Sequence, residues 1–80
     1  MNADALTAVQ DLIARIARIP RPDPDMDMYT AGLASVDALE LLVELEDAFG
    51  IAIPDDRFVN VRTAAGLAEL VGELAGGSAA

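Results

Sequence analysis

Apolar residues recur three and four positions apart in three segments of the chain, residues 3–18, 35–49 and 64–75. They are Leu6, Val9, Leu12, Ile13 and Ile16 in the first segment, Leu41, Leu42, Leu45, Ala48 and Phe49 in the second, and Leu67, Leu70, Val71 and Leu74 in the third. Because an α-helix makes one turn in about 3.6 residues, this spacing places them on one face. The pattern therefore predicts three amphipathic helices.

Polar residues and glycine mark the expected helix ends. Asn2 and Thr63 stand where the N-caps of the first and last helices are expected, and Gly50 suits a left-handed residue after the second. Asp55 follows a short extended stretch and is expected to cap a further short helix that ends at Val59. This short helix would be the third of four.

A long loop is expected between the first two main helices. Three prolines alternate with polar residues in Pro20-Arg21-Pro22-Asp23-Pro24-Asp25, which favours extended backbone. Met28, Tyr29 and Leu33 are expected to pin this loop to the core. The sequence thus predicts an all-α fold, a small four-helix bundle with three main helices, one short third helix and a long first loop. Residues 1–75 are expected to form the domain and residues 76–80 a flexible tail.

Composition narrows the possible functions. The 80 residues include no His and no Cys, which removes Cys/His catalytic pairs, zinc fingers and disulfides, and no enzyme activity is expected. The formal net charge of −9 should repel nucleic acid and anionic membranes and favour basic protein surfaces, although acidity can also serve solubility alone. Charged residues interrupt the amino-terminal segment, so it matches neither a secretory signal nor a membrane span. We expect a cytoplasmic monomer.

A single serine, Ser35, stands at the expected start of the second main helix. Acidic residues follow it at intervals of three and four beside apolar ones, which predicts a strip of mixed character on the helix surface. The strip consists of Val36, Asp37, Leu39, Glu40, Val43, Glu44 and Asp47. One helix face can then join the core while the other meets a partner. The alternatives are that Ser35 is only an N-cap and that the acids form an ordinary solvated face.

The segment GLASVDALELLVELEDAFGIAIPDD resembles the acyl and peptidyl carrier proteins. It combines a glycine, a serine and an acidic helix ending in Glu-Asp-Ala-Phe-Gly with the Ile-Pro-Asp continuation typical of that family. The resemblance extends more weakly through Arg62-Thr63 and the final helix. It implies the same order of helices as the apolar pattern does.

The resemblance implies that the hydroxyl of Ser35 receives 4′-phosphopantetheine from coenzyme A, through a Mg²⁺-dependent phosphopantetheinyl transferase. The arm would hold cargo as a thioester and present it to partner enzymes: a loading ligase or acyltransferase, and a synthase or downstream transferase with a basic docking surface. In such carriers the helix after the serine is the surface that partners recognise, here the mixed strip. Cargo would lie in a groove for which Leu39, Phe58, Val59 and Val61 are candidates; their other interpretation is ordinary core.

Ala34 departs from the family motif, because acyl carriers usually have Asp before the serine. This favours a discrete, free-standing acyl or aminoacyl carrier of polyketide or peptide-type metabolism over a fatty-acid carrier. An unmodified carrier fold that acts as an acidic docking module remains an alternative.

A calcium loop at Asp23, Asp25 and Asp27 lacks the expected glycine and terminal glutamate. A serine hydrolase is excluded for want of a histidine or lysine base.

Overall fold

The structure is a computed structural model that describes the backbone of residues 2–76 and the side chains of residues 5–76. Its helices are α1 (Asn2–Ala17), α2 (Met28–Ala31), α3 (Ser35–Phe49), α4 (Asp55–Val59) and α5 (Ala64–Ala75). The described part contains no strand, only an isolated bridge between Asp27 and Thr63. The all-α prediction is therefore confirmed. The predicted N-cap side chain of Asn2 and the tail residues 77–80 lie outside what is described.

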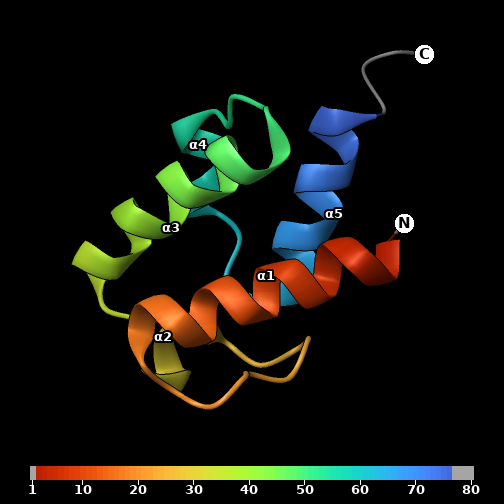
Figure 1. Ribbon diagram of the computed structural model, residues 1–80. Coiled ribbons are helices and arrows are strands. Elements are labelled where there is room, and N and C mark those ends of the chain that lie inside the picture. The colour runs from red at the N-terminus through yellow and green to blue at the C-terminus, as the bar shows by residue number, and fades with distance from the viewer. Residues whose placement is uncertain (1, 77–80) are drawn as a thin grey trace.

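The core lies where the apolar faces of the three long helices meet. Figure 1 shows α1 crossing the molecule, with α3 and α4 above it at the left of the view and α5 above it at the right. The fully or nearly fully buried side chains of these helices are Val9, Ile13, Leu41, Leu45, Phe58, Ala64, Leu67, Leu70 and Val71. Burial of such a cluster is the main favourable term in folding a domain of this size. The prediction of a buried apolar face on α3 is wrong at one position: Ala48, near the C-terminal end of the helix, is exposed.

The long first loop contains a helix that the sequence pattern did not predict. The single turn of α2 begins after Asp27, whose carboxylate accepts hydrogen bonds from the backbone N–H groups of Tyr29 (2.9 Å) and Thr30 (3.2 Å). Met28 is fully buried and Leu33 nearly so, which confirms that they pin the loop. Four residues are too few to reveal a helical period, so only the cap carried a local signal.

Backbone hydrogen bonds tie this loop to the rest of the bundle. The N–H of Met28 donates to the carbonyl of Arg62 (2.8 Å), and the N–H of Ala65 donates to the carbonyl of Pro24 (2.9 Å). The side-chain amide of Gln10 donates to the carbonyl of Pro22 (2.9 Å) from within α1. Since these bonds satisfy polar groups of the loop, its path over α1 and α5 is fixed.

Two of the predicted helix ends are confirmed and one is wrong. Gly50 is left-handed (φ 64°, ψ 41°), and the hydroxyl of Thr63 accepts a hydrogen bond from the N–H of Gly66 (3.0 Å). Asp55 does not cap α4, because it is the first helical residue and Pro54 occupies the N-cap position. Proline has no N–H to leave unsatisfied at a helix start, and Asp55 instead places a negative charge in the first turn.

Within residues 2–76, no helix is both long and apolar enough to cross a bilayer.

Candidate functional site

Ser35 is the first helical residue of α3 and its side chain is exposed. The N-cap is Ala34, in extended conformation (φ −84°, ψ 163°), so the interpretation of Ser35 as a plain N-cap is wrong. None of the described residues forms a hydrogen bond with the Ser35 hydroxyl oxygen. The hydroxyl is therefore accessible and uncommitted at the start of a 15-residue helix.

The start of α3 is only half capped. The Asp37 carboxylate accepts a hydrogen bond from the N–H of Ala34 (3.1 Å), which is the reciprocal half of a capping box. The other half is missing because the methyl side chain of Ala34 offers no acceptor to the N–H groups of the first turn. Those N–H groups and the helix dipole favour a negative group beside Ser35.

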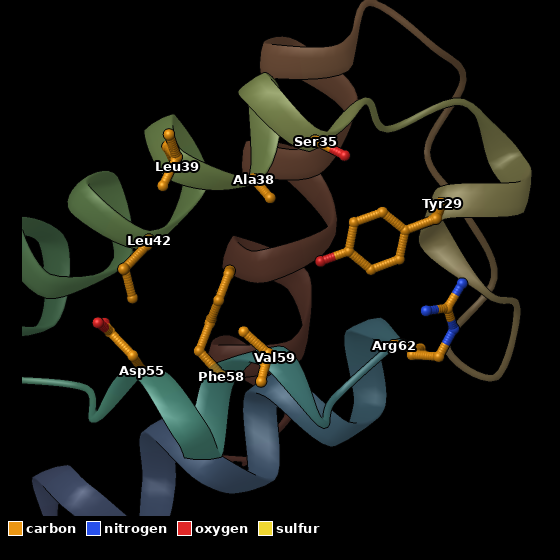
Figure 2. A pocket seen from close by; sticks show the side chains of 9 residues that line it. All are labelled: Tyr29, Ser35, Ala38, Leu39, Leu42, Asp55, Phe58, Val59 and Arg62. Atoms are coloured by element: carbon orange, nitrogen blue, oxygen red, sulfur yellow. The ribbon is translucent and has the colours of Figure 1, made fainter.

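An open groove begins at Ser35 and runs between α3 and α4. Its volume is about 590 Å³, and its walls are Ala38, Leu39 and Leu42 of α3, Asp55, Phe58 and Val59 of α4, and Tyr29 and Arg62 near the serine. Figure 2 shows the Tyr29 ring entering from α2 with its hydroxyl leading, and the Phe58 side chain pointing from α4 toward α3. The groove thus combines an apolar centre with polar groups around it.

Tyr29 and Arg62 are held together at the end of the groove nearest α2. The Arg62 guanidinium lies 4.8 Å from the centre of the Tyr29 ring, within cation–π range. Its Nε donates to Asp27 Oδ2 (2.6 Å), and Nη2 lies 3.4 Å from Oδ1 of the same carboxylate. The hydrogen bond from Arg62 lowers the pKa of Asp27, and the hydrogen bonds from the backbone of α2 act in the same direction.

The predicted groove residues occupy three different environments. Leu39 and Val59 border the groove and are 67% and 63% exposed, whereas Phe58 is 5% exposed and belongs to the core. Val61 does not line this groove, so its predicted placement is wrong; it lines a separate depression between α4 and α5. It follows α4, where the chain has already turned away from α3. Sequence reasoning missed Tyr29, Ala38, Leu42, Asp55 and Arg62 as lining residues, because they converge only in the folded chain.

Comparison with known proteins identifies the family. Residues 7–71 match the family model described as the phosphopantetheine attachment site. The chain is a member of this carrier-protein family. It is 32% identical over 60 residues to an aminoacyl carrier protein of Agrobacterium fabrum, covering 70% of this chain and 68% of the relative. It is 33% identical over 63 residues to an acyl carrier protein of Acidothermus cellulolyticus, covering 75% of each.

The site of this carrier domain suits the group that its family attaches. An exposed hydroxyl with no partner among the described residues is available for a phosphodiester, and the half-capped helix start favours the resulting anion. No group of three or more potential metal ligands occurs among the described residues. In the loop considered for calcium, both carboxylate oxygens of Asp27 already accept hydrogen bonds. The phosphopantetheine chemistry of the family therefore agrees with the local structure, whereas a calcium loop does not.

The mixed strip of α3 lies on the surface of the carrier domain. Val36, Leu39 and Val43 are 71%, 67% and 61% exposed, and because they are three and four residues apart they form one exposed apolar row on the helix. Glu40 and Asp47 are exposed, and Asp37 and Glu44 are half-buried. The predicted position of the mixed strip on the surface of α3 is confirmed.

Among the described residues, one acid of the strip forms an ion pair. The Glu44 carboxylate lies 3.6 Å from the Arg15 guanidinium of α1, whereas the Glu40 carboxylate pairs with none of the described residues. An ion pair reduces the field that a carboxylate presents to an approaching protein. Glu40 is therefore the more available charge for a basic partner.

Proposed function

We propose that this protein is a discrete acyl or aminoacyl carrier, modified with 4′-phosphopantetheine at Ser35. The observation that carries the proposal is the exposed, uncommitted Ser35 hydroxyl at the start of α3, inside the segment that matches the attachment-site family. Residues 1–75 would constitute the carrier domain and residues 76–80 its tail. We place the protein in the cytoplasm, where coenzyme A and the partner enzymes would meet it.

The role of the chain in this function is to offer a nucleophile and then to present the product. The Ser35 oxygen displaces the 3′,5′-adenosine diphosphate portion of coenzyme A, and the proton of the hydroxyl is removed by the transferase, since the chain has no histidine or lysine base. Once attached, the cofactor supplies a terminal thiol that holds an acyl or aminoacyl group as a thioester. The domain itself catalyses no step.

The mixed strip of α3 is the proposed docking surface for the transferase, for a loading ligase or acyltransferase, and for a synthase or downstream transferase. Its acids would steer basic partners, and Val36, Leu39 and Val43 would supply short-range contact. Such binding is fast and readily reversed, which suits a carrier that visits several enzymes. The aminoacyl carrier relative and Ala34 support a place in peptide or polyketide-type metabolism over fatty-acid synthesis.

Intact-protein mass spectrometry tests this function. The protein is incubated with coenzyme A, Mg²⁺ and a broad-specificity phosphopantetheinyl transferase, and a mass gain of one phosphopantetheine is expected. Ser35→Ala should abolish the gain, and Ser78→Ala, which removes the other serine of the chain, should leave it unchanged. No gain in the parent, with a conventional carrier modified in the same tube, would instead favour an unmodified acidic docking module.

A further inference from the structure

The groove beside Ser35 lies on the surface of the protein. Two of the apolar side chains that line it, Leu39 and Val59, keep about two thirds of their area exposed, at 67% and 63%. A group lying between them would remain in contact with water along one side. The groove thus offers contact to a cargo without enclosing it.

Phe58 closes the path from this groove into the core. It lines the groove, yet only 5% of its surface is exposed, and its side chain points from α4 toward α3 in Figure 2. It belongs to the same buried cluster as Leu41, Leu45 and Leu67, each of which has no exposed surface. A packed aromatic side chain cannot be displaced without losing its own burial. A long alkyl chain therefore finds no route from the groove into the core.

Polar groups surround the apolar centre of the groove. Tyr29 and Arg62 stand near Ser35, and the Asp55 carboxylate stands beside Leu42 on the opposite side. An alkyl chain laid across these groups would remove water from them without replacing its hydrogen bonds, which is unfavourable. A short cargo that carries an amino or hydroxyl group keeps those groups solvated or bonds to them.

From this arrangement we propose that the cargo is a short polar acyl group of the aminoacyl type, and that Phe58 sets the upper limit of its length. The inference rests on the proposed attachment of the arm at Ser35 and specifies what that arm carries. Phe58 acts here as a specificity-determining residue, because it fills the space that a longer chain would need.

The test compares thioesters of increasing length on the same protein. Butyryl, hexanoyl, octanoyl and β-alanyl groups are installed from the corresponding coenzyme A thioesters, and loading is verified by intact mass. The rate at which hydroxylamine cleaves each thioester on the protein is then measured. The protection factor is the rate for the same group on free pantetheine divided by the rate on the protein. Burial of a chain would raise this factor by roughly fourfold for each methylene removed from water.

In the parent protein we expect protection factors that stay the same from butyryl to octanoyl. β-Alanyl, which differs from butyryl by an ammonium in place of a methyl group, should be protected at least as well. A protection factor that rises with chain length, or butyryl protected several-fold better than β-alanyl, would overturn the proposal. Because loading is confirmed first by mass, a failure of attachment at Ser35 is seen as an absent mass gain and is not confused with either result.

Truncating the side chain at position 58 should remove the limit on cargo length. In Phe58→Ala, the octanoyl protection factor is expected to exceed the butyryl factor by more than about tenfold, since several methylenes can enter the space. Phe58→Leu, a milder truncation, should fold in any case and show a smaller rise. Val71→Ala, which truncates a buried apolar residue of α5 that does not line the groove, is the control and should behave like the parent. A flat length series in a folded Phe58→Leu and Phe58→Ala pair would show that Phe58 does not set the limit.

Discussion

The Arg62 guanidinium donates a 2.6 Å hydrogen bond from Nε to Oδ2 of Asp27, a residue 35 positions earlier in the chain. The same carboxylate caps α2 through the N–H groups of Tyr29 and Thr30. One side chain therefore joins the loop that leads into Ser35 to the segment that connects α4 with α5. This junction positions two polar residues of the groove, Tyr29 and Arg62, beside Ser35, the proposed attachment residue.

The contribution of this ion pair to stability should depend on pH. The pKa of Asp27 is lowered from its ordinary value of 3.8, chiefly by the hydrogen bond from Arg62. A carboxyl whose pKa is lower in the folded state stabilises the fold fully above its unfolded pKa, and the contribution is lost as pH falls through the folded value. The difference in free energy of unfolding between the parent and Asp27→Asn should thus be constant near neutral pH and shrink below about pH 4.

Urea unfolding of the parent and of Asp27→Asn, at pH values from about 7 to about 2.5, measures this difference in free energy of unfolding. Asp25→Asn, which removes one charge from the same loop without breaking an ion pair among the described residues, is the control. The Arg62 side chain is 58% exposed and the Asp27 side chain 34%, so water and ions reach the pair and added salt should weaken the effect. A gap between the parent and Asp27→Asn that widens on acidification would contradict the assigned role of the carboxylate.

Ala34→Asp and Ala34→Asn should stabilise the apo protein by about 1 kcal/mol each, because either side chain can accept from the first-turn N–H groups of α3. After modification of Ser35 the gain from aspartate should fall, since its charge then stands beside the phosphodiester, whereas the gain from asparagine should fall less. Chemical denaturation of the apo and modified forms gives all four values. Equal gains in both forms would mean that the phosphate does not approach the helix start.

Gly32→Ala should destabilise the fold by about 1–3 kcal/mol. Gly32 has φ +134°, and a Cβ there would lie 2.8 Å from Cγ2 of Ile19. Gly72→Ala is the contrasting change: a Cβ meets no atom within 4 Å at this site inside α5, so alanine should stabilise by about 0.5–1 kcal/mol. Thermal unfolding of the two variants should shift in opposite directions. A neutral Gly32→Ala would show that the turn before Ser35 is adaptable.

Arg18→Gly should stabilise the protein by about 1 kcal/mol. Arg18 follows the last residue of α1 with φ 58°, and the N–H of the next residue, Ile19, donates to the carbonyl of Ala14 (3.1 Å), the pattern of a Schellman cap. Glycine adopts this conformation without the Cβ penalty. Arg18→Ala removes the same charge but keeps a Cβ, so it should not share the gain, and equal unfolding free energies for the two variants would refute the backbone explanation.

Charge reversal at Glu40 should slow modification of the carrier by a basic transferase at low salt by about 10-fold or less, without unfolding the domain. Glu69→Lys on α5 makes the same change in net charge away from the mixed strip and is the matched control. Glu44→Lys is a less specific test of docking, because it also breaks the ion pair with Arg15. Initial rates of phosphopantetheine transfer at several salt concentrations measure the effect. Equal rates for Glu40→Lys and Glu69→Lys would place docking elsewhere.

The sequence by itself determined the long helices and the position of Ser35. Periodicity over 12 to 16 residues is a local signal that reports which face can be buried, and the glycine and threonine at positions 50 and 63 act on their immediate neighbours. The family resemblance of the segment around Ser35 is likewise local. The exposure of Val36, Leu39 and Val43 followed from the same period, because a helix with one face in the core must expose the other.

Only the tertiary structure decided what surrounds Ser35. The single turn of α2 depends on the burial of Met28 and on a hydrogen bond to Arg62, both of which come from segments distant in sequence. In the five-residue helix α4, no periodicity distinguishes Phe58 from Val59, yet one is 5% and the other 63% exposed. Packing of α4 against the core makes that choice. It is a long-range contact, and so the sequence could indicate Ser35 as the proposed attachment residue but not the shape of the groove beside it.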